Sequence, residues 1–185
     1  MRLILEGPDN AGKTSLAQRL LQANVHVKYN HPGGKPDSFE DEERCIKEQL
    51  IWLHDHHTIL DRVTPISQRV YNPDEVADKF RIDMWSHYLQ HKPVVVYCRP
   101  STDRLMRFQD FTWRDGETEE HRQKIIRNQH TFIERYDAIM ATVPHVLYAF
   151  DEPMGEIVAI KLLQAFGGSK DAQQWLFNIQ NYRSA

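Results

Sequence analysis

Apolar residues along the chain alternate between short continuous runs and longer stretches with helical spacing. The short runs predict five strands, at Arg2–Glu6, Val25–Tyr29, Thr58–Asp61, Pro93–Cys98 and His145–Phe150. The longer stretches predict helices at Lys13–Ala23, Phe39–Asp55, Pro73–Gln90, Glu119–Ala141, Met154–Phe166 and Lys170–Tyr182, with one more starting near Ser101. Because strands and helices alternate, we predict an α/β fold with a five-stranded, mainly parallel sheet flanked by helices.

Composition is typical of a globular protein and disfavours several functions. Of the 185 residues, 41% are apolar and 26% are charged, so we expect one domain over 1–185 with a C-terminal appendage at about 169–185. The net charge of −3 disfavours a protein that coats nucleic acid, since such binding needs surplus Lys and Arg. No apolar stretch approaches the roughly 20 residues of a membrane span. With no secretory signal, Cys45 and Cys98 are predicted to be reduced thiols of a cytoplasmic protein.

The segment from Gly7 to Thr14 carries the strongest chemical signal. It fits the pattern G-x-x-x-x-G-K-[ST] and lies between a predicted strand and a predicted helix. Glycines let the backbone curl so that successive N–H groups point at one anion, and the helix directs its positive end to the same place. Lys13 adds a full charge, and the Thr14 hydroxyl is a predicted Mg²⁺ ligand. The predicted ATP-binding residues are Asp9, Asn10, Ala11, Gly12, Lys13, Thr14 and Ser15.

The phosphate loop alone does not identify the reaction that the protein catalyses, but a second group of charged residues limits the possible reactions. The N-K-x-D segment that reads guanine in GTPases is missing. Asp61 and Arg62 follow the third predicted strand, and parallel sheets bind ligands at the carboxyl ends of their strands. We interpret Asp61 as a residue that orders Mg²⁺, partly through water, and Arg62 as one that holds an acceptor phosphate. A surface ion pair at a turn is the alternative interpretation.

Three segments share an informative order and spacing. Residues 6–14 read E-G-P-D-N-A-G-K-T, residues 29–36 read Y-N-H-P-G-G-K-P, and residues 61–71 begin with D-R and end with S-Q-R-V-Y. Together they resemble the thymidylate kinase family and its deoxynucleoside-kinase relatives. The corresponding family patterns are E-G-x-D/E-x-x-G-K-[ST], R-E-P-G-G-T-P and D-R-x-x-x-S-[NQ]-x-A-Y. The resemblance implies a P-loop kinase fold.

The resemblance also implies roles for residues of an acceptor pocket. In the family, the acid inside the phosphate loop binds the sugar hydroxyl of the acceptor, which implies this role for Asp9. The family's arginine after the third strand grips the acceptor phosphate, which implies this role for Arg62. By the same resemblance, Gln68 and Tyr71 contact the nucleotide, and Pro32 lines the pocket.

The chain departs from the family pattern around this pocket. Asn30 and His31 stand where the family has Arg and Glu, and Ser67 lies one residue further from Asp61 than usual. The predicted helix before the third strand is shorter than the family's pair of helices, so the base-stacking aromatic residue cannot be transferred by position. Trp52 is our candidate for that residue, with packing in the core as the alternative.

Arginines that follow the fourth predicted strand resemble a kinase lid. Residues 108–122 contain a polar, glycine-containing turn between two predicted helices. A lid that closes over the phosphates expels water and brings positive charge to the transferred group. In the family the catalytic arginine comes from the phosphate loop or from the lid, and here the loop has Asn10. The resemblance therefore implies a lid arginine, with Arg114 as the first candidate and Arg122 as the second.

These features predict ATP-dependent phosphorylation of a deoxynucleoside monophosphate, with dTMP or a related pyrimidine nucleotide favoured and with Mg²⁺ as cofactor. The predicted catalytic residues are Lys13, Asp61, Arg62, Arg114 and Arg122. One alternative is a deoxynucleoside kinase in which Asp61 is the base for a sugar hydroxyl. Others are a kinase of a modified base or an end in DNA, and a non-catalytic nucleotide switch. The expected partners are small nucleotides, and the resemblance leaves a homodimer open.

Overall fold

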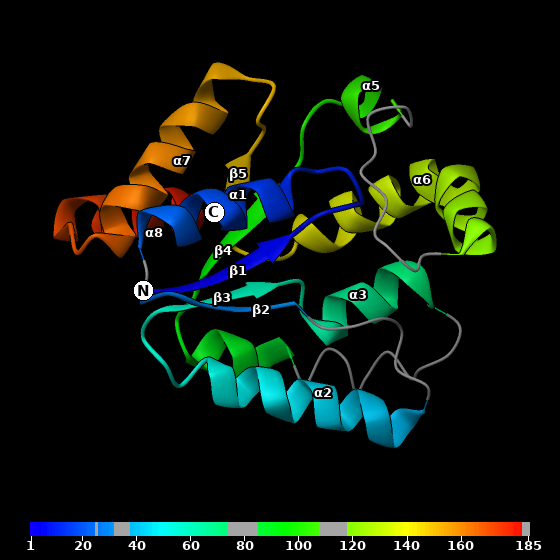
Figure 1. Cartoon of the computed structure of the whole chain (residues 1–185), viewed down its shortest axis with the longest axis horizontal. Coiled ribbons are helices and arrows are strands. Elements are labelled where there is room, and N and C mark those ends of the chain that lie inside the picture. The colour runs from blue at the N-terminus through cyan, green and yellow to red at the C-terminus, as the bar shows by residue number, and fades with distance from the viewer. Residues whose placement is uncertain (25, 32–37, 74–84, 108–117, 183–185) are drawn as a thin grey trace.

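Five parallel strands form the centre of the molecule. The computed structural model describes residues 1–24, 26–31, 38–73, 85–107 and 118–182. The strands are β1 (Arg2–Glu6), β2 (Lys28–Asn30), β3 (Thr58–Asp61), β4 (Val94–Cys98) and β5 (Val146–Tyr148). They lie in the order β2-β3-β1-β4-β5, and all neighbours pair in parallel (Figure 1). The predicted five-stranded parallel sheet is confirmed.

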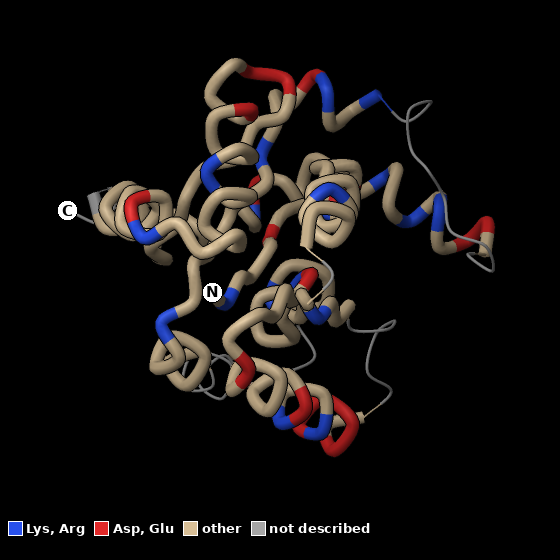
Figure 2. Tube along the Cα trace, turned by 60° about the vertical axis from the view of Figure 1, so that its left-hand side comes forward, with Lys and Arg blue, Asp and Glu red and all other residues tan. Residues whose placement is uncertain are grey.

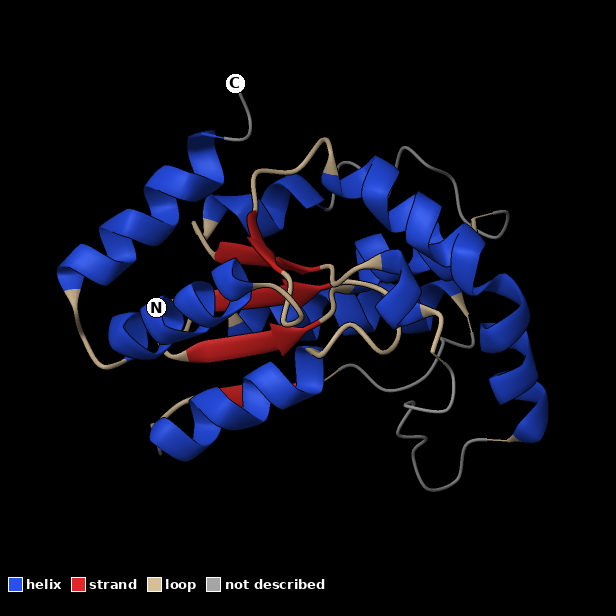
Figure 3. Cartoon of the chain, turned by 90° about the horizontal axis from the view of Figure 1, so that it is seen from above, coloured by secondary structure: helices blue, strands red, loops and turns tan. Residues whose placement is uncertain are grey.

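Helices cover both faces of this sheet (Figure 3). They are α1 (Lys13–Ala23), α2 (Phe39–Trp52), α3 (Thr64–Tyr71), α5 (Thr102–Leu105), α6 (Glu119–Met140), α7 (Pro153–Phe166) and α8 (Lys170–Tyr182), and residues 85–90 are also helical. Side chains of β1 alternate between the faces. Leu3 and Leu5 join a core cluster with α1, α7 and α8. Ile4 joins a second cluster with α2, α3 and α6.

Most predicted elements are observed with small shifts at their ends. β1, β3, α1 and α8 have the predicted bounds. β2 was expected at Val25–Tyr29 but covers Lys28–Asn30, because this edge strand pairs with β3 through those three residues; residue 25 lies outside the described residues. α2 ends at Trp52 instead of Asp55, because the amides of His54 and Asp55 bond to carbonyls three residues back, as in a tightened last turn. The remaining strands and the long helices α6 and α7 shift by one or two residues.

The apolar pattern of the sequence does not predict the helix α3. Its eight residues are too few for a clear helical repeat. Pro65 in the first turn is the signal that could have found it, since proline fits the start of a helix. The helix predicted at Pro73–Gln90 is observed over residues 85–90, and residues 74–84 lie outside the described part of the chain.

The C-terminal helix α8 packs into the body of the protein. Ala172 and Leu176 are fully buried in the cluster that contains α7. The Gln180 side chain accepts a hydrogen bond from the amide of Val95 in β4 at 2.8 Å. The segment expected as an appendage is therefore tied to the sheet by both apolar and polar contacts.

Charged residues of both signs are spread over the described elements (Figure 2). Acidic residues gather at the start of α2, where Ser38 caps the helix by accepting a hydrogen bond from the amide of Asp41. Cys45 and Cys98 are free thiols. Among the described helices, none combines the length and apolar character that crossing a membrane requires.

Candidate functional site

Gly7, Asn10 and Gly12 shape the loop between β1 and α1. Their φ angles are 145°, 61° and 78°, in the region that favours glycine. A Cβ at Gly7 would collide with the carbonyl oxygen of Cys98, and a Cβ at Gly12 would lie 2.8 Å from the ring of Phe150. The first amides of α1, directly after Gly12, have no partners within the helix. The loop thus has the curled backbone of a phosphate site, while its binding of ATP stays a prediction.

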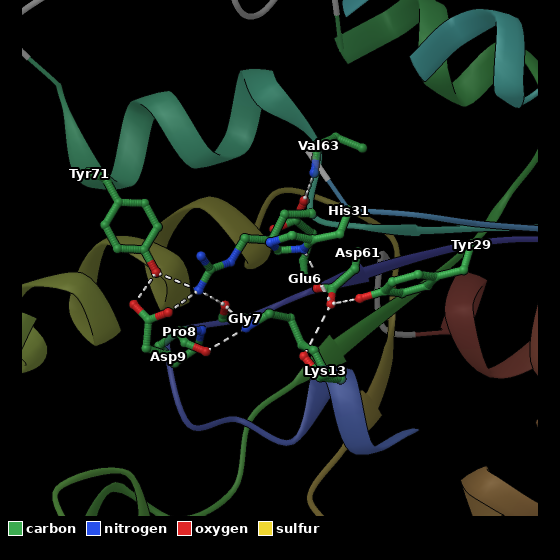
Figure 4. Close-up of polar contacts among 12 residues, drawn as sticks. Glu6, Gly7, Pro8, Asp9, Lys13, Tyr29, His31, Asp61, Val63 and Tyr71 are labelled. Carbon is green, nitrogen blue, oxygen red and sulfur yellow. Dashed lines mark hydrogen bonds and ion pairs between the residues drawn. The ribbon is translucent and has the colours of Figure 1, made fainter. Parts of the chain in front are cut away.

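Lys13 folds back into this loop (Figure 4). Its Nζ donates hydrogen bonds to the carbonyl oxygens of Gly7 and Pro8, both at 2.7 Å, and the residue is 7% exposed. Burial, followed by the neighbouring charge of Arg62, lowers the pKa of Lys13 to about 8. The side chain is therefore still mostly cationic at neutral pH, and its ammonium group lies inside the curled loop.

Asp61 lies opposite the start of α1, at the carboxyl end of β3. Its Oδ2 accepts hydrogen bonds from the hydroxyls of Tyr29, at 2.6 Å, and Thr14, at 3.4 Å. The Nδ1 atom of His31 lies 3.5 Å from the same oxygen. Burial opposes ionisation, but hydrogen bonds from His31 and Tyr29 and the charge of Lys13 outweigh it and hold the pKa of Asp61 well below its usual value. Asp61 is therefore an anion.

Thr14 and Asp61 together suit a hard cation. The second carboxylate oxygen of Asp61, Oδ1, is buried and has no hydrogen-bond partner among the described residues. Mg²⁺ prefers oxygen ligands and keeps several waters, so a hydroxyl beside an ionised carboxylate fits its needs. The residues present thus fit the predicted Mg²⁺ site.

Asp9, Arg62 and Tyr71 form a second group of polar side chains (Figure 4). Arg62 Nη2 donates to Asp9 Oδ1 at 2.7 Å and to the Tyr71 hydroxyl at 2.8 Å. The Tyr71 hydroxyl donates to Asp9 Oδ2 at 2.9 Å, so the three side chains close a ring of hydrogen bonds. Burial opposes ionisation of Asp9, but the charges of Arg62 and Lys13 outweigh it and lower the pKa of Asp9 to about 2.

Arg62 has an unusual backbone for an L-residue. Its φ is 71°, in the left-handed region, where holding a side-chain-bearing residue costs on the order of 1–3 kcal/mol. This backbone conformation is accompanied by a separation of the Asp61 and Arg62 side chains. Asp61 and Arg62 are consecutive, yet Asp61 contacts Thr14 of α1 while Arg62 contacts Asp9 and Tyr71. Two neighbouring side chains therefore face two different parts of the site.

Glu6, the last residue of β1, lies fully buried behind these groups. Its Oε1 accepts a hydrogen bond from the amide of Val63 at 2.6 Å, and its Oε2 has no hydrogen-bond partner among the described residues. Burial raises the pKa of Glu6 to about 8. The carboxyl group is thus mostly protonated at neutral pH and adds little charge to the site.

Helix α6 contacts the phosphate loop through Gln129, which sequence reasoning missed. The fully buried Gln129 donates from Nε2 to the carbonyl oxygen of Asp9 at 3.0 Å. A glutamine on the apolar face between Ile125 and Phe132 is the signal that could have found it. Arg122 lies seven residues before Gln129, hence on the same helix face, and is half-buried. Arg122 therefore faces the side of α6 that carries the loop contact.

The structure brings most, but not all, of the predicted site residues together. Gln68 is buried on α3 and accepts a hydrogen bond from Asn72 at 2.9 Å. Trp52 lies at the end of α2, where its carbonyl oxygen bonds to Thr58 at the amino end of β3, and its ring packs against the second core cluster. The structure does not bring Trp52 to Asp9, Arg62 or Tyr71. Ala11 is buried and Ser15 exposed, whereas Pro32 and Arg114 lie outside the described residues.

Phe150 and Arg104 contact each other beside the phosphate loop, where the Phe150 ring lies next to Gly12. Arg104 lies over the Phe150 ring, 5.3 Å from its centroid, and Phe150 is 36% exposed. The Asp151 carboxylate accepts hydrogen bonds from the amide and the hydroxyl of Ser101, which ties the loop after β5 to the start of α5. Arg104 and Phe150 are therefore joined by a cation–π contact next to the phosphate loop.

These features define a P-loop kinase fold with a two-sided site. The sequence matches no protein-family model and no curated protein. The fold is similar to that of the YorR protein from Bacillus subtilis in complex with phosphorylated GDP, over 100% of this chain and 99% of that one, with a TM-score of 0.60 and 16% identity. It is also similar to a deoxyadenosine kinase from M. mycoides with bound dATP, over 91% and 100% of the chains, with a TM-score of 0.50 and 15% identity.

Proposed function

We propose that the protein transfers the γ-phosphoryl group of ATP to a nucleoside or nucleotide acceptor. The observation that carries the proposal is the pair Asp61 and Arg62: Asp61 contacts Thr14 on one side, and Arg62 contacts Asp9 and Tyr71 on the other. A triphosphate in the phosphate loop and an acceptor at Asp9 and Arg62 would then meet between two fixed charges. Such placement of reactants supplies much of the rate in phosphoryl transfer.

In this mechanism the chain binds and orients the reactants. The loop amides and Lys13 hold the phosphates, and Lys13 stabilises the charge that develops on the transferred group. Thr14 and Asp61 would hold Mg²⁺, which would supply positive charge to neutralise the phosphates. Arg122 would bring further positive charge from α6, and we propose the same role for Arg114, which lies outside the described residues. Gln68 and Pro32 would contact the acceptor.

For the acceptor we propose a deoxynucleoside monophosphate, with dTMP or a related pyrimidine nucleotide favoured. The phosphate of such an acceptor is already ionised, so the reaction needs no general base, and Arg62 supplies a charge-assisted contact to it. The resemblance of residues 61–71 to the family pattern supports this choice.

A deoxynucleoside is the second candidate, and one contact favours it. Arg62 is already paired with Asp9 at 2.7 Å, so part of its charge is neutralised before an acceptor phosphate arrives. A sugar hydroxyl adds no charge to the site. Asp61 is an anion and would serve as the base that removes the hydroxyl proton.

An ADP-release assay over all common nucleosides and their monophosphates tests the proposal. We expect release with at least one acceptor, and loss of that release in Lys13→Ala. Turnover of dTMP no better than that of every other acceptor would overturn the proposed preference. Undiminished turnover in Lys13→Ala would overturn the mechanism. Absence of ADP release with all acceptors would favour a nucleotide-binding switch.

A further inference from the structure

The start of α3 is capped from inside the protein. Val63 precedes the helix and has no side chain that can accept a hydrogen bond. Val63 and Thr64 are buried, so water does not reach their amides. Instead, the Val63 amide donates to Glu6 Oε1 at 2.6 Å and the Thr64 amide to Gln49 Oε1 at 3.1 Å. The next residue, Pro65, has no N–H. Two core side chains therefore satisfy the first amides of the helix.

Glu6 continues the pairing of β1 with β3 beyond the point where the backbone can pair. The Arg62 amide donates to the carbonyl oxygen of Leu5 at 2.8 Å. The chain then leaves the sheet at Gly7 to form the phosphate loop. The Glu6 side chain takes the next amide, that of Val63, in place of a backbone carbonyl. Glu6 thus joins the loop strand to the turn that carries Arg62.

Gln49 is itself held in place on the other side of this turn. It is 2% exposed, and its Oε1 also accepts a hydrogen bond from the hydroxyl of Tyr88 at 2.6 Å. Tyr88 is fully buried in the second core cluster. The oxygen that binds the Thr64 amide therefore has a fixed position.

These contacts lie on both sides of Arg62, whose backbone has the left-handed conformation. The residue before it is fixed in β3, and the residue after it is fixed by Glu6. We propose that Glu6 and Gln49 are positioning residues, which hold α3 and the turn before it so that the guanidinium of Arg62 points at Asp9 and Tyr71. The inference rests on the proposed function, in which Arg62 contacts the acceptor.

Replacing each oxygen-bearing side chain by methionine tests the role. Glu6→Met and Gln49→Met keep the length of the side chain but leave a buried amide without a partner. We expect the acceptor KM to rise about tenfold in each variant and the ATP KM to change less than about twofold. Glu6→Gln keeps an acceptor oxygen and should recover most of the acceptor affinity. A Glu6→Gln variant as poor as Glu6→Met would overturn the role of Glu6.

Ile4→Ala is the matched control. Ile4 lies on the same strand and the same sheet face as Glu6, is fully buried, and binds no amide of α3. It should destabilise the protein through a core cavity and leave the ratio of the two KM values unchanged. An equal rise of the acceptor KM in Ile4→Ala would show that a loosened core alone causes the rise, and would overturn the inference.

Amide hydrogen exchange tests the cap without any assay of activity. In the unaltered protein, the Val63 and Thr64 amides should exchange at least about a hundredfold more slowly than unprotected amides. Glu6→Met should speed exchange at Val63, and Gln49→Met should speed it at Thr64, with Ile59 in β3 as the internal reference. Fast exchange at both amides in the unaltered protein would overturn the cap. Absence of ADP release would instead overturn the proposed function, and the exchange result decides the cap even where a variant fails to fold.

Discussion

The sheet has two edges, one formed by the carboxyl ends of its strands and one by their amino ends. Both edges carry ion pairs, which differ in their exposure to water. At the carboxyl edge, Asp61 is fully buried, and the ion pair of Arg62 with Asp9 has side chains only 17% and 29% exposed. At the amino edge, Lys28 pairs with Asp55, but their side chains are 60% and 53% exposed. Each edge pairs a basic side chain with a carboxylate, but the two pairs differ in their exposure to water.

This difference explains why one edge is a candidate site and the other is not. Water and salt screen an exposed pair, so it contributes little, whereas a pair with little water around it interacts strongly and holds its geometry. The amino edge also gathers histidines, including His54 and His91, whose rings pack edge to face with centroids 4.8 Å apart. Within the described residues, no three His, Cys, Asp or Glu side chains converge on a metal-binding geometry.

Asp61→Asn should produce the largest effect, and Asp55→Asn at the other edge is its control. Asparagine keeps the shape of Asp61 but removes the charge proposed to order Mg²⁺, so kcat/KM should fall by about 10²–10³. Asp55→Asn should leave kcat/KM unchanged. Steady-state kinetics of both variants measure the contrast. Equal losses in both would remove the distinction between the edges.

The Asp61 variant also separates the two acceptor classes. With a hydroxyl acceptor, Asp61→Asn removes both the base and the charge that orders Mg²⁺, whereas with a monophosphate acceptor it removes only that charge. The loss of kcat/KM should therefore be at least about tenfold larger for a deoxynucleoside than for its monophosphate. Steady-state kinetics of Asp61→Asn with each acceptor measure the two losses, and equal losses would contradict a role of Asp61 as base.

Arg62→Ala should have the next largest effect, with Lys28→Ala as the exposed counterpart. Removing Arg62 leaves Asp9 with Tyr71 as its remaining side-chain partner, which should lower the unfolding free energy by about 2–4 kcal/mol. The acceptor KM should rise at least about tenfold. Lys28→Ala should change neither quantity measurably. Urea unfolding and kinetics test both variants, and an Arg62→Ala protein as stable as the wild type would contradict the contrast.

Local sequence signals predicted the sheet and the phosphate loop, because each depends on residues close together in the chain. The apolar runs gave β1 and β3 their bounds, and the glycine spacing predicted the curled backbone. Contacts between distant segments were not predictable in this way. Gln129 bonds to the Asp9 carbonyl from 120 positions away, and the link from Glu6 to Val63 spans 57. Trp52 was a candidate by residue type, but its helix ends at the opposite edge of the sheet.

Low pH should lower the unfolding free energy of the protein by protonating Asp9 at the carboxyl edge. Its folded pKa of about 2 lies below its ordinary value of 3.8, so its ionised form stabilises the fold above pH 3.8, and that stability is lost as the pH falls toward 2. The loss should be roughly 2 kcal/mol. Urea unfolding across this pH range should show a steeper decline in the wild type than in Asp9→Asn. Parallel curves would contradict the buried ion pair.

The smallest effect should come from His91 at the amino edge. Burial, followed by the charges of His54 and Arg2, lowers the pKa of His91 below 6.5. The unfolded chain therefore binds more protons just below pH 6.5, and stability that is fully present above this pH declines as the pH falls. His91→Phe keeps a ring against His54 but does not titrate. Its urea midpoint should fall less than that of the wild type between about pH 7 and about pH 5, by a smaller amount than the Asp9 effect, because water screens this edge. A His91 effect as large as that of Asp9 would show that the amino edge is electrostatically coupled as strongly as the carboxyl edge, and would end the contrast between them.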